Sequence, residues 1–276
     1  MNDSTKLVMA VIVTAVVCIA GTYVLTSGSN GGSDATIIKC EGSTTLSPLM
    51  EKYAEIYEGY ANVRIEIVSN GSQNGVDAAN NGIADIGMSS RNVGHASHAG
   101  LLETKVGIDT VVLVVGSGTG VTSLTKAEVE GIYNGTITNW NMVGGNTLAI
   151  SPLDRQSGSG TRTYFEESFN GVSATRSWPD LDQTGTVIGY VQSNPGAIGY
   201  VSLGSLTTAQ QSMALALDMG SGSVSPIGDL PNYTLKRDLV LLTKDVPTGQ
   251  VAMFIGWILG PEGQKILTDE GYLPLA

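Results

Sequence analysis

The sequence has little cysteine, little histidine and few charged residues. Two of its 276 residues are cysteines, two are histidines, and 14% are charged. Cys18 lies in an apolar run near the N-terminus, which leaves Cys40 as the one cysteine of the body, so no internal disulfide is possible there. His95 and His98 have a spacing that suits two metal ligands, but no cysteine or third histidine joins them. We therefore predict no metal site and favour a solvated surface pair.

Positive charge is also scarce. The chain has 14 Lys and Arg residues against 25 Asp and Glu residues, a net charge of -11 at pH 7. This balance argues against nucleic acid or an anionic membrane surface as a partner held by bulk charge, so any bound anion must be held by local dipoles. The apolar content of 42% and the 36 glycines indicate a globular chain with a real core and many tight turns.

Residues 1–26 are predicted to be a membrane anchor or a signal segment. Residues 7–25 carry no charge, and at ~1.5 Å per residue their length comes close to the ~30 Å hydrocarbon core of a bilayer. Signal peptides have shorter apolar cores, which favours a retained anchor, and Val17 before Cys18 argues against lipidation. Residues 27–35 form a Gly/Ser-rich tether. We expect the body to be extracytoplasmic, tethered to the outer face of the cytoplasmic membrane, or secreted if the segment is cleaved.

From about residue 36 the chain alternates strand and helix patterns. This alternation predicts an α/β protein of two lobes, each a mostly parallel sheet flanked by helices. The pattern restarts after the apolar strand at 109–118, so residues 111–115 and 235–242 are candidates for two strands that cross between the lobes. Two such crossings make a hinge with a cleft. The predicted division is lobe 1 at residues 36–110 and 238–276, and lobe 2 at residues 111–237.

Three loops place small hydroxyl residues and glycine at the starts of predicted helices. They are "EGSTTLSP" from Glu41, "NGSQNG" from Asn70 and "SGSGT" from Ser157. A helix N-terminus has unpaired N–H groups and about half a positive charge, so it attracts anions. A single loop of this kind is commonly an ordinary helix cap. Three of them at the carboxyl ends of strands favour a ligand site.

Two arginines lie close to these loops in the sequence. Two residues separate Arg155 from the Gly-Ser-Gly run that follows it, and a guanidinium can donate two parallel hydrogen bonds to a tetrahedral oxyanion. Arg91 follows Ser90 at the end of another predicted strand. An ion pair between Arg91 and Asp85, Asp154 or a neighbouring acid is an equally simple interpretation of that residue.

The motifs occur in the order of a known family from about residue 36 to the C-terminus. They are "GSTTLSPL", "GSQNGV", "ADIGMSSR", "LTKAEVEGIYNGTITNW", "RQSGSGTRTYFEE", "NPGAIGYVSLG" and "GPEGQKILTDEGYLPL". The chain resembles the substrate-binding proteins of phosphate-specific ABC transporters, which have the type II periplasmic-binding-protein fold. The resemblance implies a monomer without a cofactor that captures inorganic phosphate in the cleft and delivers it to an ABC permease and ATPase complex.

The resemblance also implies a set of phosphate-binding residues. These residues come from the three loops and from the strand end before Arg91. They are Thr44, the backbone of Thr45, Ser72, Ser90, Arg155, Ser159, Gly160 and Thr161.

Two positions depart from the family pattern. Well-studied members carry an aspartate at the position of Ser90, which accepts a proton from hydrogen phosphate that sulfate cannot supply. Ser157 stands where some members have an aspartate that braces the arginine, and Asp154 is an open alternative for that role. We therefore expect weaker rejection of sulfate. Phosphate is the first candidate ligand, with sulfate, molybdate or another tetrahedral oxyanion as alternatives.

Two other function classes stay open on the sequence alone. A phosphohydrolase is disfavoured because the chain has no Walker-type loop, "GSGTG" at Gly116 lacks the dinucleotide-binding spacing, and "SGSG" at Ser157 is not a nucleophile elbow. A tethered phosphate sensor would share every binding feature, so the sequence does not separate it from a transport protein.

Overall fold

The computed structural model describes residues 35–91, 100–172 and 180–275. The predicted anchor and nearly all of the predicted tether lie outside this range, as do His95 and His98. Across the described part of the chain, none of the helices combines the length and the apolar character needed to span a bilayer.

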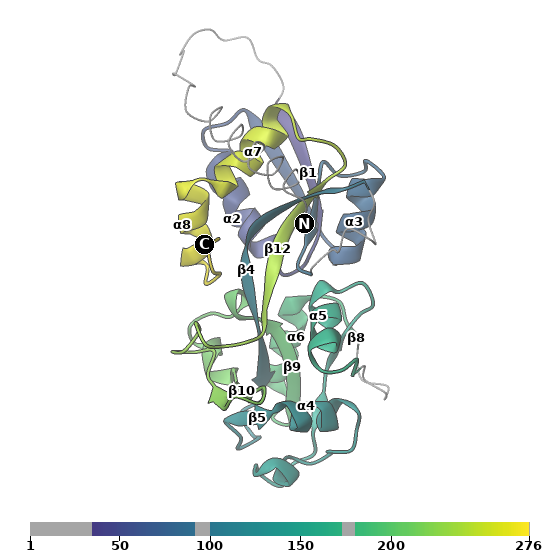
Figure 1. The fold of residues 1–276 in the computed structure, drawn as a ribbon, viewed down its shortest axis with the longest axis vertical. Coiled ribbons are helices and arrows are strands. Elements are labelled where there is room, and N and C mark those ends of the chain that lie inside the picture. Colours follow the sequence, from purple (N-terminus) through teal and green to yellow (C-terminus); the bar gives the residue numbers. More distant parts are fainter. Residues whose placement is uncertain (1–34, 92–99, 173–179, 276) are drawn as a thin grey trace.

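Two lobes lie one above the other, with strands β4 and β12 running between them (Figure 1). The elements of lobe 1 are β1 (Thr36–Gly42), α2 (Ser47–Tyr57), β2 (Val63–Ser69), α3 (Ser72–Asn80), β3 (Ile86–Ser89), α7 (Gly249–Leu259) and α8 (Pro261–Asp269). The elements of lobe 2 are β5 (Ser123–Thr125), α4 (Lys126–Tyr133), β6 (Ser151–Pro152), β7 (Asp154–Arg155), α5 (Gly160–Ser168), β8 (Asp180–Leu181), α6 (Thr184–Ser193), β9 (Ala197–Ser202), β10 (Ala216–Asp218) and β11 (Ser223–Val224). The two crossing strands are β4 (Leu102–Val115) and β12 (Lys236–Thr243).

One seven-stranded sheet runs through both lobes, in the order β2-β1-β3-β12-β4-β9-β6. The pairs β1–β2, β1–β3 and β6–β9 are parallel, as the alternation of strands and helices predicts. The pairs β3–β12, β12–β4 and β4–β9 are antiparallel. This difference from the prediction follows from the connectivity, because β4 leads out of lobe 1 and β12 returns to it. Two smaller sheets, β11-β10-β5 and β7-β8, complete lobe 2 and are not apparent from the sequence pattern.

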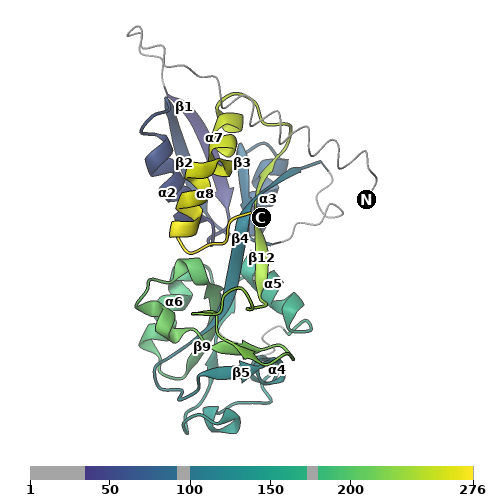
Figure 2. The same ribbon diagram turned by 60° about the vertical axis from the view of Figure 1, so that its left-hand side comes forward.

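Strand β4 is longer than its sequence pattern predicts. It begins at Leu102 rather than near Asp109. Its first part, up to Thr110, pairs with β12, and the part from Val111 to Val115 pairs with β9. The early part was missed because "LETKV" carries charged residues that obscure the apolar pattern of a strand. A single strand therefore takes part in the sheets of both lobes (Figure 2).

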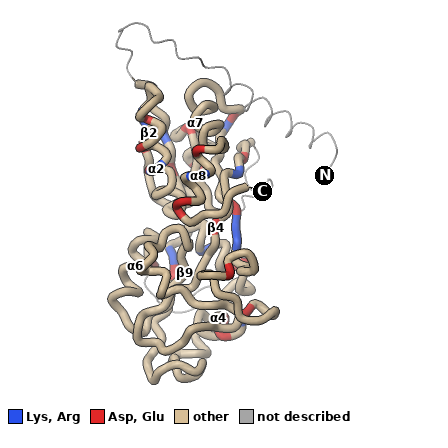
Figure 3. Tube along the Cα trace, turned by 90° about the vertical axis from the view of Figure 1, so that its left-hand side faces the viewer, with Lys and Arg blue, Asp and Glu red and all other residues tan. Residues whose placement is uncertain are grey.

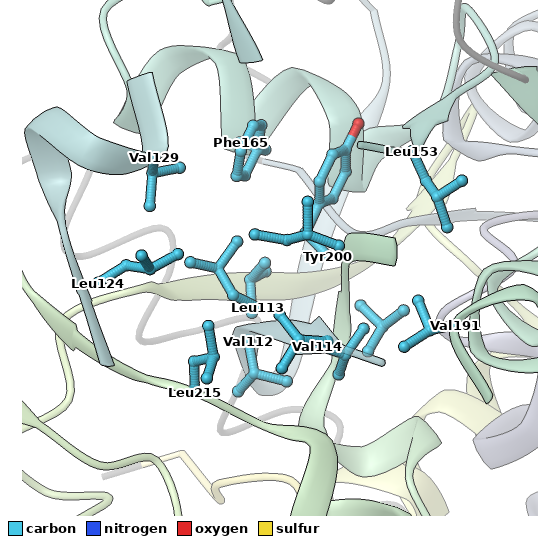
Figure 4. Close-up of a cluster of buried hydrophobic side chains, with 14 of the residues drawn as sticks. Val112, Leu113, Val114, Leu124, Val129, Leu153, Phe165, Val191, Tyr200 and Leu215 are labelled. Carbon is cyan, nitrogen blue, oxygen red and sulfur yellow. The ribbon is translucent and has the colours of Figure 1, made fainter. Parts of the chain in front are cut away.

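Each lobe has its own hydrophobic core. One cluster of buried side chains comes from residues 38–106 and 239–272, and the other comes from residues 111–235. In the second cluster the rings of Phe165 and Tyr200 stack with centroids 4.1 Å apart (Figure 4). Figure 4 shows the Tyr200 hydroxyl at the edge of this cluster, on the side away from Leu215. The α5 helix that carries Phe165 is thereby fixed against β9.

Helix α3 lies very close to the sheet because glycines face one another there. A Cβ atom on Gly75 would stand 2.8 Å from the Cα of Gly42, and one on Gly87 would stand 2.3 Å from the carbonyl oxygen of Gly75. Any side chain at these positions would push the helix away from β1 and β3. The glycines therefore determine how closely the start of α3 packs on the ends of these strands.

Charged residues are thinly spread along the trace (Figure 3). Four of the nine ion pairs among the described residues, such as Lys52–Glu55 and Lys265–Asp269, have both side chains exposed, and such pairs contribute little to stability. The most buried ion pair among the described residues is Arg237–Asp109, whose side chains are 0% and 1% exposed.

We predict that Gly75→Ala destabilises the protein by about 1–3 kcal/mol, the usual effect of overpacking a close contact. The new Cβ would stand 2.5 Å from the carbonyl oxygen of Glu41 and 2.7 Å from that of Met88. Gly189→Ala is the matched control, because Gly189 is also helical and nothing lies within 4 Å of its added Cβ. The control should stabilise by roughly 0.5–1 kcal/mol. Urea unfolding measures both, and equal effects of the two changes would contradict the packing described for α3.

Candidate anion-binding site

The eight residues expected from the sequence come together where the two lobes meet. Helices α2 and α3 begin on the lobe 1 side, and α5 and α6 begin on the lobe 2 side. All three predicted loops lie at the carboxyl ends of strands, after β1, β2 and β7, which is where α/β sheets bind ligands. The predicted convergence of helix starts is therefore present in the fold.

Arg155 is a buried charge on the lobe 2 side of this site, with 1% of its surface exposed. Its Nε donates to the carbonyl oxygen of Leu181 at 3.0 Å, and Nη2 donates to the carbonyl oxygen of Asp182 at 2.9 Å. Its Nη1 donates to Thr184 Oγ1 at 3.3 Å, and Nη2 also donates to Thr44 Oγ1 at 2.9 Å. All four acceptors are uncharged oxygens. The guanidinium is thus held in place by acceptors that do not neutralise it.

The pKa of Arg155 reflects this environment. Burial lowers the pKa of the guanidinium to about 10, and the nearby positive charge of Arg237 acts in the same direction. The group still carries its proton at neutral pH. The charges of Asp182 and Asp154 oppose this lowering of the pKa, but no carboxylate accepts a hydrogen bond from the guanidinium. A buried cation paired in this way favours a negative charge placed beside it.

Asp154 holds the backbone of Arg155 and not its guanidinium. Asp154 Oδ1 accepts from the Arg155 backbone N–H at 2.8 Å and from the hydroxyl of Tyr200. Its Oδ2 lies 3.5 Å from Nη2 of Arg162. Ser157, the other residue considered for bracing the arginine, is exposed. The guanidinium is positioned by the carbonyls of the β8–α6 loop instead, which answers the question that the sequence left open.

Hydroxyl groups form close pairs around Arg155. Thr44 Oγ1 lies 3.2 Å from Thr184 Oγ1, and Thr45 Oγ1 lies 3.2 Å from Thr161 Oγ1. In each pair one threonine belongs to lobe 1 and the other to lobe 2. Either hydroxyl can be the donor, so each pair can exchange its mutual hydrogen bond for bonds to an anion placed between the lobes.

Ser72, Ser90 and Gly160 form the other side of the site. Ser72 Oγ lies 3.4 Å from Ser90 Oγ and accepts from the Ser90 backbone N–H at 3.2 Å. Ser43 Oγ donates to Ser90 Oγ at 2.9 Å. A Cβ on Gly160 would stand 2.4 Å from Ser72 Oγ and 3.0 Å from Ser90 Oγ, so only glycine permits this approach between the lobes.

Two serine hydroxyls accept hydrogen bonds from backbone N–H groups, one at the start of α5 and one in the turn before α2. Ser159 Oγ accepts from the Arg162 backbone N–H at 3.3 Å and is the N-cap of α5. Ser43 Oγ accepts from the backbone N–H groups of Thr45 and Leu46, at 3.2 Å and 3.3 Å. The Ser159 hydroxyl accepts at the helix start and keeps its own proton for donation, so capping and anion binding are compatible there. Ser43 already donates its proton to Ser90 Oγ. The Thr45 N–H, which the family resemblance assigns to phosphate, donates here to Ser43.

The lobes touch on both sides of the site. The Gln73 backbone N–H donates to the carbonyl oxygen of Gly158 at 3.1 Å, and Gln183 Nε2 donates to the carbonyl oxygen of Ser69 at 3.0 Å. Gly158 has φ of 88°, which favours glycine in the "SGSG" turn. A cavity of about 350 Å³ opens beside Thr44 with walls from both lobes. Its walls include the Thr44–Thr184 hydroxyl pair.

A larger cavity, of about 440 Å³, lies in lobe 2 between α4 and β10. It contains none of the eight residues, and its walls include Lys126, Glu130 and Asp218. We assign the site to the lobe interface because the buried cation and the hydroxyl pairs are there.

Arg91 forms no ion pair with Asp85 or Asp154 in the described part of the chain, although the charges of Asp77 and Glu167 act on it. Its Nη2 donates to Gln73 Oε1 at 2.5 Å, and partial burial lowers its pKa. The Asp85 carboxylate instead accepts from the backbone N–H of Lys39 at 2.8 Å. Arg91 thus braces the first turn of α3 at Gln73, next to Ser72. Within the described ranges there is no group of three or more His, Cys, Asp or Glu residues able to hold a metal ion.

Three residues of the site were not found from the sequence. Thr184 contacts Arg155, and Ser43 contacts Ser90. Both are hydroxyl residues at or just before the start of a helix, which is the sequence pattern that marks the other loops. Arg237 is the third. Its Nη2 donates to Thr45 Oγ1 at 3.2 Å. Nothing in the local sequence marks Arg237, because its position depends on the pairing of β12 with β4.

Comparison with known proteins places this geometry in a family. Residues 27–262 match the PBP superfamily domain. The phosphate-binding protein PstS of Borreliella burgdorferi is 29% identical over 255 residues, which cover 86% of this chain and 89% of that protein. PstS of Bacillus subtilis is 29% identical over 245 residues, which cover 85% and 79% of the two chains.

Solved structures give the same result. A phosphate ABC transporter substrate-binding protein from Clostridium perfringens, with bound phosphate, is 30% identical and superposes with a TM-score of 0.77, covering 87% of this chain and all of that one. An ABC-type phosphate transport receptor from Vibrio cholerae is 27% identical, with a TM-score of 0.68 and coverage of 86% and 100%. The chain therefore belongs to the PBP superfamily and has the two-lobed type II periplasmic-binding-protein fold.

Proposed function

We propose that this protein captures inorganic phosphate between its two lobes and delivers it to an ABC-type importer. The observation that carries the proposal is the buried Arg155 guanidinium, whose four acceptors are all uncharged and which is surrounded by hydroxyl donors. The relatives named as phosphate-binding proteins and the homologous structure with bound phosphate support it. Those relatives are binding proteins, which favours capture of the anion over catalysis.

Phosphate binds, in this proposal, by replacing contacts that the site residues make with one another. Thr44, Thr45 and Thr161 turn their hydroxyls from their threonine partners to the phosphate oxygens, and Arg155 supplies the charge. Helix starts contribute further dipoles. Ser72, Ser90, Ser159 and Gly160 complete the predicted set, and Thr184 joins it because it contacts both Arg155 and Thr44.

Closure of the two lobes buries the ligand. We infer that the lobes, at residues 36–110 with 238–276 and at 111–237, move about the crossing strands. The cavity beside Thr44 lets the anion enter when they separate. The partners are then an ABC permease and ATPase complex, and the protein acts as a monomer. The apolar segment at residues 1–26 keeps the body at the outer face of the cytoplasmic membrane, where the tether raises its local concentration near the permease.

Ser90 makes fully ionised oxyanions such as sulfate a second candidate class of ligand. The hydrogen bonds of its side chain are with two other hydroxyls, Ser43 and Ser72, and a hydroxyl can either donate or accept. A fully ionised oxyanion such as sulfate therefore meets a donor at this position, where a carboxylate would repel it. This supports a site that discriminates weakly between phosphate and sulfate.

We predict that Arg155→Ala weakens phosphate binding by about 1.5–3 kcal/mol, the range for hydrogen bonds to a charged group. The change removes the one guanidinium that contacts both Thr44 and Thr184. Isothermal titration calorimetry on the full-length protein in detergent measures the effect. Arg64→Ala is the control, because the Arg64 side chain is 71% exposed on β2 and should be neutral. Absence of phosphate binding by the unchanged protein would refute the proposed function, and equal affinity after Arg155→Ala would refute the site.

We predict that Ser90→Asp raises the preference for phosphate over sulfate by about tenfold or more. The carboxylate can accept the proton of hydrogen phosphate, whereas sulfate leaves it as a buried, unpaired acceptor. Competition titrations with both anions at neutral pH give the ratio. Ser157→Asp adds the same charge at an exposed position of the third loop and should leave the ratio unchanged. An unchanged ratio in the Ser90 variant would show that this residue does not decide selectivity.

A further inference from the structure

A second buried arginine lies at the same site, on the crossing strand β12. Arg237 Nε and Nη2 donate to Asp109 Oδ2 at 2.9 Å and 2.7 Å. The two residues are direct partners in the register of β12 and β4. They therefore stand at the point where the chain passes from one lobe to the other (Figure 1).

The Arg237–Asp109 pair is fully removed from water, with side chains 0% and 1% exposed. Asp109 Oδ1 accepts from Ser202 Oγ at 2.5 Å, and burial raises the pKa of Asp109 while Arg237 and Ser202 oppose that rise. A buried ion pair is often no more stabilising than apolar residues of the same size. A structural role in joining β4 to β12 therefore does not by itself explain why these two positions carry charges.

Of the two residues, Arg237 faces the anion site. Arg237 Nη2 reaches Thr45 Oγ1 at 3.2 Å, while Asp109 lies behind it, against Ser202. Nη1 of Arg237 is buried and has no hydrogen-bond partner within the described residues. The Tyr164 ring lies 5.9 Å from the guanidinium carbon. A buried donor with no acceptor is uncommon in folded proteins and points to a missing partner.

The two arginines of the site are arranged alike. Arg155 donates to Thr44 Oγ1, and Arg237 donates to Thr45 Oγ1, the next residue of the chain. A guanidinium has no acceptor, so each threonine accepts from its arginine and keeps its hydroxyl proton to donate elsewhere. In addition, the positive charge of Arg237 helps to lower the pKa of Arg155, after the larger effect of burial. The two cations are close enough to repel each other, and an anion near both would remove that repulsion.

We propose that Arg237, held by Asp109, is a second cationic residue of the anion site, which adds charge toward a doubly charged oxyanion and orients the Thr45 hydroxyl as a donor. This inference rests on the proposed function, because it concerns the same ligand and the same cleft. It makes Arg237 a positioning residue that acts on the anion through Thr45 and through its charge. Its carboxylate partner only fixes its place.

The test uses the opposite signs of the two charges. Full-length protein in detergent is titrated with inorganic phosphate at neutral pH, as the unchanged chain and as the Arg237→Gln and Asp109→Asn variants. Arg237→Gln should weaken binding by about tenfold or more, since it removes a nearby cation and a hydrogen bond to Thr45. Asp109→Asn should bind phosphate at least as tightly as the unchanged protein, because it removes a negative charge and leaves the arginine.

Two further variants distinguish the loss of positive charge at the site from a failure of the protein to fold. The double variant Arg237→Gln with Asp109→Asn replaces the ion pair by a neutral one of similar shape, so it avoids a lone buried carboxylate. It should still bind about tenfold more weakly or worse. Arg237→Lys keeps the charge and should retain affinity to within a few-fold even if Arg237→Gln does not fold. Thermal unfolding without phosphate shows which variants are folded.

A matched control comes from the same two strands. Lys105 and Asp238 form an ion pair between β4 and β12, with Nζ and Oδ1 2.6 Å apart and side chains 42% and 38% exposed. Lys105→Gln should leave phosphate affinity unchanged. If the unchanged protein binds no phosphate, both the proposed function and this inference are refuted. If the unchanged protein binds but the double variant binds equally well, or Asp109→Asn weakens binding as much as Arg237→Gln, only the role of Arg237 is refuted.

Discussion

The site depends on one buried charge that is held but not neutralised. Arg155 donates to two backbone carbonyls and two threonine hydroxyls, and none of these acceptors carries a charge. An isolated cation in a protein interior is unfavourable, and the rest of the fold must hold it there. The stacked core under α5 and the contact between Asp154 and the Arg155 backbone do so. The interior of the protein is thus arranged around an affinity for negative charge, although the chain as a whole is strongly acidic.

Glycine and hydroxyl residues bring the two lobes to that charge. Gly75 lets α3 lie directly on the sheet, and Gly160 lets the start of α5 approach Ser72 and Ser90. Because these approaches are made by backbone and short side chains, four helix starts reach one small volume. The donors around the site are therefore fixed by the packing of helices on strands. Long flexible side chains contribute only the two arginines.

Much of the fold and most of the site could be predicted from local sequence patterns. Helix starts such as that at Ser72 are marked by short motifs, and Arg155 stands beside one of them. The same hydroxyl at a helix start marks Thr184, but no arginine or Gly-Ser run stands beside it in the sequence. The Asp109–Arg237 pair has no local signal at all. Its members are far apart in the sequence, and only the antiparallel register of β4 and β12, which depends on the whole sheet, brings them together.

The unbroken course of β4 through both lobes has a mechanical consequence. The chain passes between the lobes twice, in two hydrogen-bonded strands, so the lobes can bend or twist about this ribbon but cannot slide along it. In such a bending motion, atoms near the ribbon move little and atoms far from it move through larger distances. Arg237 lies on this ribbon, so its hydrogen bond to Thr45 is close to the axis of any such bending.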